Sequence, residues 1–217
     1  MYLCSEFLEK RIKMTEINEY RRELRDKIVE YAMTEFYKRG IKAVKMDEIS
    51  QGLHVSKRTV YEIFGDKEEM LLAGIKARKE NIRKKLAEFA QDVSHNVIDI
   101  VAYFYKLQIA HNEQVGYLFF EEMHKYPRVI EFLQASHERE HADTIRFFQE
   151  GIREGFFRAD VNYELHVEVA NIALQEIMHN QLYKKYSIQD LFNSYFLVII
   201  RGFCTPQGIK KLDQLFF

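Results

Sequence analysis

The sequence predicts an all-α fold in two parts, and three observations support this prediction. Nearly half of the 217 residues are apolar, which is enough for a sizeable core. The chain has two prolines and nine glycines, so long uninterrupted helices are possible. Apolar residues recur at helical spacing throughout, whereas the alternation typical of strands is scarce.

The first clear helix precedes Gly40. Leu24, Ile28, Ala32 and Phe36 recur every four residues and therefore share one face. Gly40 favours the turn that ends this helix, because glycine tolerates positive φ. A lead-in of residues 1–20 comes before this helix, and Met14 is an alternative start of the protein. Basic residues in and just after the lead-in form either an arm along DNA phosphates or a solvated helical extension. They are Lys10, Arg11, Lys13, Arg21, Arg22 and Arg25.

Two short helices with a tight turn between them are expected next. Met46, Ile49 and Leu53 make an apolar stripe on the first. The pair His54-Val55 interrupts the pattern, and Ser56 is a suitable N-cap for the second helix, over residues 56–64.

The second short helix is basic on its outer side. Val60 and Phe64 face inward, which leaves other side chains at its start and outer face: Lys57, Arg58, Thr59 and Tyr61. Two short helices joined by a tight turn, with a basic N-terminal end on the second, are the geometry that enters a DNA major groove.

The same residues resemble the DNA-binding domain of the TetR family of transcriptional regulators. The matches run in order without a gap: Ala32, Phe36, Gly40, Ile49, Val55, Ser56, Thr59, Tyr61, Phe64, Lys67 and Leu71. The resemblance implies double-stranded DNA with a palindromic operator as a partner, a homodimer, and no cofactor. It also implies DNA contacts from Lys45, Ser56, Lys57, Arg58, Thr59, Tyr61 and Lys67.

Three positions depart from the family pattern. Lys45 replaces the Thr or Ser that usually caps the second helix, and Leu53-His54 replaces the usual Ala-Gly of the turn. Histidine adopts positive φ less readily than glycine.

Charge is distributed unevenly along the chain. Residues 1–90 hold 20 Lys and Arg against 16 Asp and Glu, whereas residues 91–217 hold 12 against 17. DNA affinity needs positive charge where phosphates lie, not a basic total. The asymmetry fits a DNA-binding domain at 21–66 and an acidic body at 67–217.

The body reads as a series of helices. Asp66 and Glu69 resemble a capping box for the first, which runs to about Glu88. The nearly all-round apolar stretch from Val97 is expected to be the central buried helix. The predicted ranges are 67–88, 97–111, 115–125, 128–154, 162–185 and 187–202.

The last of these helices has more apolar residues than one core-facing side requires. Such a surplus indicates an interface. The resemblance implies a four-helix dimer bundle made by the last two long helices, and the residues expected at its centre are Leu191, Tyr195, Phe196, Ile199 and Phe203.

Several body residues combine apolar bulk with polar tips, as in a small-molecule pocket. The same residues are also typical of an aromatic helical core, and at any single position the core interpretation is favoured. The candidates are Tyr103, Leu107, His111, Phe119, Met123, Phe147, Asn171, Gln175 and Met178. We expect a repressor released from DNA by a small, largely apolar ligand, or else a DNA-binding regulator without a pocket.

A second alternative comes from residues 137–141, which match the zinc hydrolase motif H-E-x-x-H. No further histidine follows at a suitable spacing, and the surrounding charged run reads as a solvated face. We therefore expect no metal and no enzyme, because no catalytic triad or phosphate-binding loop is visible either. Two cysteines and the lack of a signal peptide or membrane span predict a cytoplasmic protein.

Overall fold

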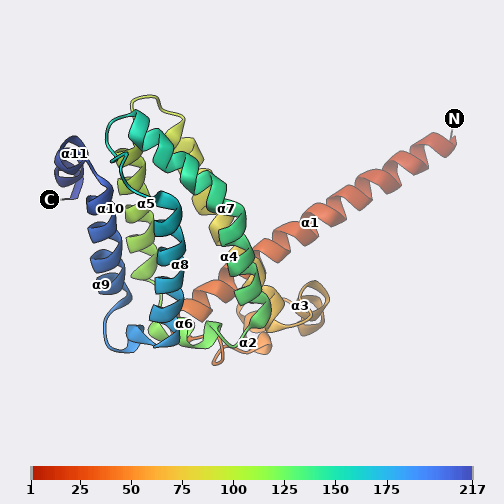
Figure 1. Cartoon of the computed structure of the whole chain (residues 1–217). Helices are drawn as coiled ribbons and strands as arrows, with labels where there is room; N and C mark the ends of the chain where they lie inside the picture. Colours follow the sequence, from red (N-terminus) through yellow and green to blue (C-terminus); the bar gives the residue numbers. More distant parts are fainter. Residues whose placement is uncertain (1, 217) are drawn as a thin grey trace.

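The computed structural model describes the backbone of residues 2–216 and the side chains of residues 18–216. Within these residues the chain forms helices and turns, with a single isolated bridge between Phe157 and Cys204 (Figure 1). The predicted all-α class is therefore confirmed. None of the described helices combines the length and the apolarity that a membrane crossing requires.

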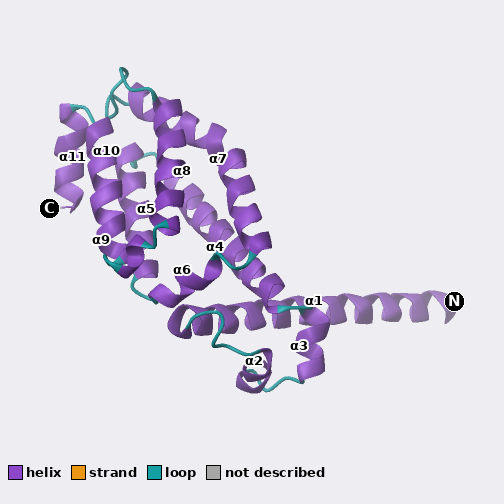
Figure 2. Ribbon diagram, turned by 60° about the horizontal axis from the view of Figure 1, so that its bottom comes forward, coloured by secondary structure: helices purple, strands orange, loops and turns teal. Residues whose placement is uncertain are grey.

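Four helices form the N-terminal part: α1 (Tyr2–Arg39), α2 (Met46–Gly52), α3 (Lys57–Ile63) and α4 (Lys67–Ala90). In Figure 2, α2 and α3 lie on one side of α1 and the remaining helices lie on the other. Helix α4 begins beside α1 and runs into the body, so it belongs structurally to both parts.

The body follows without a linker. It comprises α5 (Val97–Asn112), α6 (Tyr117–Met123), α7 (Pro127–Arg153), α8 (Tyr163–His179), the 3₁₀ turn η1 (Leu182–Lys184), α9 (Ile188–Phe192), the π-helical turn η2 (Asn193–Leu197), α10 (Val198–Phe203) and α11 (Pro206–Phe216).

Buried apolar residues gather in two clusters. The first, called here the junction core, joins α1–α4 to α6 and the start of α7; Phe36, Ile49, Phe64, Phe119 and Val129 are among its buried members. Because body residues complete this cluster, residues 21–66, called here the head, do not have a core of their own.

The second cluster, called here the distal core, lies at the other end of the body. It joins the start of α5 to α7, α8, α10 and α11 through residues such as Ile98, Phe148, Phe157, Phe203 and Leu212. The central helix α5 is thus buried at its N-terminal end, whereas beyond Ala102 its residues are only half-buried or exposed. The prediction that this helix is buried throughout is wrong.

Three predicted elements need correction. The helix expected over 162–185 ends at His179, because Gln181 takes a left-handed conformation with φ of 53°. The last long helix starts at its predicted cap, Ser187, but contains the π turn η2. Helix α11 was not predicted, although Thr205 and Pro206 are suitable cap and first-turn residues, and the Thr205 hydroxyl accepts from the Gly208 amide.

Candidate nucleic-acid interface

The turn between α2 and α3 has the conformation that a helix-turn-helix requires. His54 adopts φ of 55°, so it occupies the left-handed position usually given to glycine. Ser56 caps α3, because its Oγ accepts a hydrogen bond of 3.0 Å from the Thr59 amide. Val60 and Phe64 are fully buried, and they fix α3 with its other face outward.

That outer face carries two cations paired with carboxylates of the same domain. Lys57 pairs with Asp47, and Arg58 Nε donates to Glu62 Oε1 at 2.7 Å. The Arg58 side chain is 88% exposed. Exposed pairs of this kind are weak, so both cations can exchange their carboxylates for DNA groups at little cost.

Three other predicted contacts differ in accessibility. Tyr61 and Lys45 are exposed, and Lys45 makes no side-chain capping bond to α2, as its identity suggested. Thr59 is half-buried, and its hydroxyl lies 2.7 Å from that of Ser56. In the free protein these two hydroxyls satisfy each other and hold the start of α3.

Lys67 is used differently from the prediction. Its Nζ donates to the carbonyl oxygen of Ile41 at 2.9 Å, and burial lowers its pKa below the ordinary value. The side chain therefore stabilises the turn after α1. A phosphate contact from Lys67 stays a prediction.

Several hydrogen bonds tie the head to the body. Gly40 ends α1 with φ of 82°, and a side chain there would meet Leu118 of α6. The Lys42 amide donates to Glu122 Oε2 at 2.6 Å. Arg128, at the start of α7, donates to Asp66 at the start of α4. Movement of α6 or α7 would thus be transmitted to the head.

The predicted ligand-binding residues do not surround one cavity. Phe119 is buried in the junction core, whereas Phe147 packs against the distal core. Tyr103 stacks on Phe89 with ring centroids 4.3 Å apart, and Gln175 is exposed. Leu107, His111, Met123, Asn171 and Met178 are half-buried.

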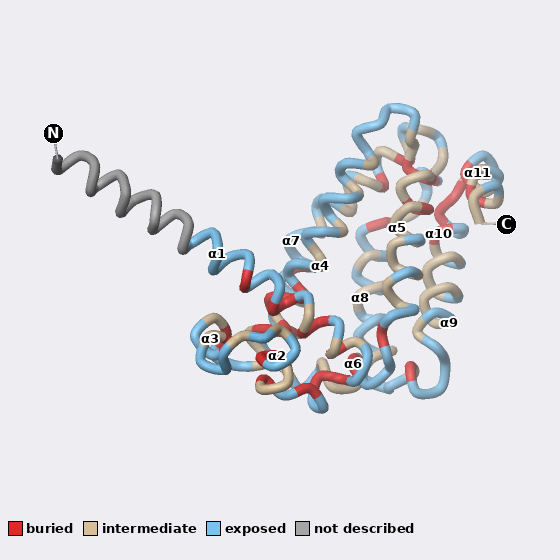
Figure 3. Tube along the Cα trace, turned by 180° about the vertical axis from the view of Figure 1, so that it is seen from behind, coloured by how far each residue is buried: buried red, intermediate tan, exposed pale blue. Residues whose placement is uncertain are grey.

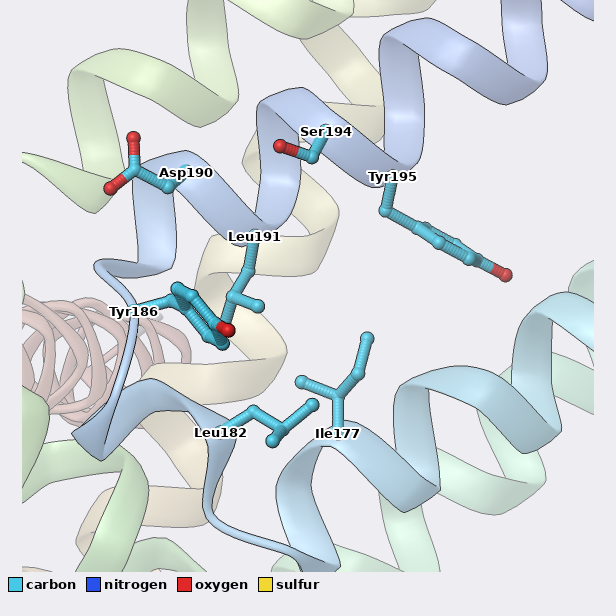
Figure 4. A pocket seen from close by; sticks show the side chains of 7 residues that line it. All are labelled: Ile177, Leu182, Tyr186, Asp190, Leu191, Ser194 and Tyr195. Carbon is cyan, nitrogen blue, oxygen red and sulfur yellow. The ribbon is translucent and has the colours of Figure 1, made fainter.

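One cavity lies on the body surface between α8 and the α9–η2 segment. It has a volume of about 350 Å³, and Figure 4 shows its lining: Ile177, Leu182, Tyr186, Asp190, Leu191, Ser194 and Tyr195. Two of these residues, Leu191 and Tyr195, were predicted at the dimer interface.

The second cavity is an open groove of about 810 Å³ between α1 and α4, closed at one end by the last turn of α5. Of the predicted ligand-binding residues, it includes only His111. Sequence reasoning missed this groove because one wall comes from α1 of the helix-turn-helix domain and the other from α4 of the body, and helical spacing does not show that these two helices enclose a space.

The residues predicted at the dimer interface differ in how deeply the single chain buries them. Phe203 is buried in the distal core, and Phe196 lies against Phe104 and Phe192, so both face into the subunit. Phe203 therefore leaves little surface for a partner, whereas Phe196 is half-buried and keeps part of its ring exposed, and an interface role for these residues stays a prediction. Apolar residues outside the predicted set that are exposed on α8 and α10 are Leu165, Val169, Ile172, Leu174 and Val198.

The H-E-x-x-H run lies on α7. His141 Nε2 lies 3.0 Å from a carboxylate oxygen of Glu164, and Glu140 accepts from Lys79 at 3.0 Å. Within residues 18–216, no three His, Cys, Asp or Glu side chains gather in a way that could hold a metal ion. These charged residues link α7 to α8 and α4.

Comparison with known proteins agrees with this geometry. Residues 28–73 match the family model of bacterial regulatory proteins of the tetR family. No curated protein matches the chain in sequence.

Solved structures share the fold over most of the chain. A TetR family regulator from Agrobacterium tumefaciens is 14% identical, with 85% of this chain and 100% of that one covered and a TM-score of 0.63. Regulatory protein TetR from Rhodobacter sphaeroides is 19% identical, with coverage of 82% and 97% and a TM-score of 0.61.

A third structure, from Saccharomonospora viridis, contains choline; it is 16% identical, with coverage of 80% and 97% and a TM-score of 0.59. At these identities the structures establish a common fold, whereas the family model and the α2–α3 geometry concern the DNA-binding domain itself. Residues 28–73 thus match a tetR family DNA-binding domain both in sequence and in the geometry of α2 and α3, and most of the chain shares the fold of the TetR family regulators described above.

Proposed function

We propose that the protein is a homodimeric repressor that binds a palindromic operator through α3 and leaves it when a small ligand binds. The observation that carries this proposal is the outer face of α3, where Lys57, Arg58 and Tyr61 are exposed while Val60 and Phe64 anchor the helix from behind. A rigid helix that presents cations and an aromatic hydroxyl can both read bases and hold phosphates.

The proposed roles of these residues follow from how exposed each side chain is. Arg58 is the most exposed and can donate two hydrogen bonds to one guanine. Lys57 starts the helix and suits either a base or a phosphate, and Tyr61 suits a phosphate. Thr59 is less accessible, so at most its methyl group would reach a thymine.

The dimer is proposed from the outer body surface. Leu165, Val169 and Ile172 recur at helical spacing along α8 and are all exposed, and Val198 adds to them from α10. An uncovered apolar face of this kind usually marks an interface. A two-fold dimer through this face would place two α3 helices for half-sites about one DNA turn, roughly 34–36 Å, apart.

Release by a ligand would act through α4. This helix forms part of the junction core and continues into the body, and α6 and α7 contact its start and the turn after α1. A ligand that prefers one body arrangement would therefore change the spacing of the two α3 helices. Ligand and operator must then weaken each other's binding by equal factors.

The test is selection of genomic fragments by the purified protein, followed by footprinting of the enriched site. We expect a palindromic footprint and increased transcription from the adjacent promoter when the gene for this protein is deleted. Decreased transcription would contradict repression, and an asymmetric footprint bound by one chain would contradict the dimer.

A regulator that responds to no ligand in its body is the second candidate. It is favoured by the division of the predicted pocket residues between two cores, with Phe119 in one and Phe147 against the other. Titration of apolar compounds against free and operator-bound protein separates the two. Equal affinity in both states would support the second candidate.

A further inference from the structure

The groove between α1 and α4 contains a cation without a carboxylate partner. Arg78 lies on its α4 wall, and no Asp or Glu of the described side chains approaches its guanidinium within 4.0 Å. The side chain is half-buried, and desolvation lowers its pKa below the usual range. A partly buried charge without a counter-charge is costly, so this site favours an anion.

The guanidinium is held in place from behind. Its Nη2 donates to Gln108 Oε1 of α5 at 2.7 Å. This bond fixes the plane of the group and uses one of its five donors. The remaining N–H groups can pair with a carboxylate, for which the planar guanidinium is well suited.

Two neutral donors lie close to Arg78. Tyr37 and His111 pack edge to face, with ring centroids 4.9 Å apart, and both line the groove. Burial raises the pKa of Tyr37 to about 12 and lowers that of His111 to about 4. At neutral pH both are uncharged, so the cluster carries a single positive charge and suits a monoanion.

The rest of the groove determines what kind of anion would fit. Its floor includes Val29 and Met33 of α1 and Ala73 and Ala77 of α4. These small or apolar side chains leave a volume of about 810 Å³, far larger than an inorganic ion. Charged residues of both signs, including Arg25, Asp26, Glu30, Lys38 and Glu113, line the same opening.

We propose that the α1–α4 groove binds a small organic monocarboxylate, with the carboxylate on Arg78 and the apolar part on the floor. The ligand would contact α1 of the DNA-binding head and α4 at once, so it would fix their relative position. Its regulatory meaning rests on the proposed function, whereas binding itself can be measured without DNA.

Octanoate labelled with ¹³C at its carboxyl carbon is a suitable probe, and its binding to the full-length protein can be followed by NMR and calorimetry. We expect saturable binding by millimolar concentration, and affinity about tenfold lower for octan-1-ol, which has the same chain without the charge. Absence of octanoate binding, or equal affinity for the alcohol, would overturn the proposal.

Two variants locate the site. Arg78→Gln should lower octanoate affinity about tenfold, whereas Arg83→Gln, an exposed arginine of the same helix paired with Glu80, should leave it unchanged. Ala77→Met keeps Arg78 but adds a bulky side chain at an exposed residue of the groove lining, and it should also abolish binding. Unchanged affinity in either groove variant would show that octanoate binds elsewhere and would overturn the proposal.

The octanoate titration uses the protein without DNA, so failure of the carboxylate proposal can be distinguished from failure of the repressor proposal. Loss of operator binding would not alter the octanoate titration. Conversely, a protein that represses normally but binds no octanoate would refute the carboxylate site alone.

Discussion

The junction core and the outer body helices differ sharply in how far one chain completes them. Ile28, Phe36 and Phe64 are fully buried in the junction core, whereas Ile172 of α8 and Val198 of α10 are 64% and 69% exposed. Figure 3 shows the same contrast along the trace, with buried residues concentrated where α1–α4 meet α6. The head therefore needs only its own chain, while the outer helices have an apolar face that a second surface would cover.

This difference assigns separate tasks to the two regions. A well-packed core resists deformation and can hold α3 at a fixed angle. An uncovered apolar face gains free energy when it associates, so it can define the distance between two heads. Variants in the two regions should consequently fail in different assays.

The largest effect is expected for Phe36→Ala in the junction core. Removal of a fully buried phenyl ring destabilises a protein by about 3–5 kcal/mol. Urea unfolding at constant protein concentration should show this loss, together with loss of DNA binding. Tyr61→Ala, which truncates an exposed aromatic residue of α3, is the control and should change stability little. Similar unfolding midpoints for the two variants would remove the contrast between core and surface.

Next in size is the effect of a negative charge on the exposed apolar face of α8 and α10. If the proposed dimer forms through this face, Ile172→Glu and Val198→Glu should each give a monomer in sedimentation, because an unpaired carboxylate in an apolar interface costs several kcal/mol. Circular dichroism should stay helical, since both side chains are largely exposed in the single chain. Val93→Glu, at a fully exposed position in the α4–α5 turn, should remain dimeric. A wild-type chain that sediments as a monomer at micromolar concentration would refute the interface.

A smaller effect is expected at the DNA-facing surface. Arg58→Ala should weaken binding to the selected operator by about 1–3 kcal/mol if Arg58 reads a base. Its unfolding and its sedimentation should match the wild type, because the side chain is outward and weakly paired. Arg146→Ala, another exposed arginine paired with a nearby carboxylate, is the matched control on α7. Operator affinities that are equal for both variants would place Arg58 away from the DNA.

The contrast between the regions also explains what could be predicted from the sequence. In the head, each local signal agreed with the packing: the stripe of Leu24, Ile28 and Phe36 is buried, and Ser56 caps α3. Local and tertiary preferences coincide there, so periodicity and caps were sufficient. Even His54 adopts the positive φ that its position in the turn requires.

In the body, local signals were ambiguous. Phe196 and Phe203 read as surplus apolar residues, yet they pack inside, whereas Ile172 and Val198 face outward. The π turn of η2 changes which residues share a face along this segment, and a regular helical period does not anticipate it. Long-range packing also decides where cavities lie, so the groove beside Arg78 could not be read from spacing alone.

The smallest effect comes from a pair of matched caps, one in each region. Ser56 Oγ accepts from the Thr59 amide and Ser187 Oγ accepts from the Asp190 amide, both at 3.0 Å. Replacement of either serine by alanine should cost about 1 kcal/mol, because one amide at a helix start loses its acceptor. Hydrogen exchange should quicken only in the helix that follows the changed cap.

Ser56→Ala should then weaken operator binding without altering sedimentation, and Ser187→Ala should weaken the proposed dimer without altering the unfolding of α3. If either variant changed both properties equally, α3 and α9 would behave as one cooperative unit, and the division of tasks between the two regions would be wrong.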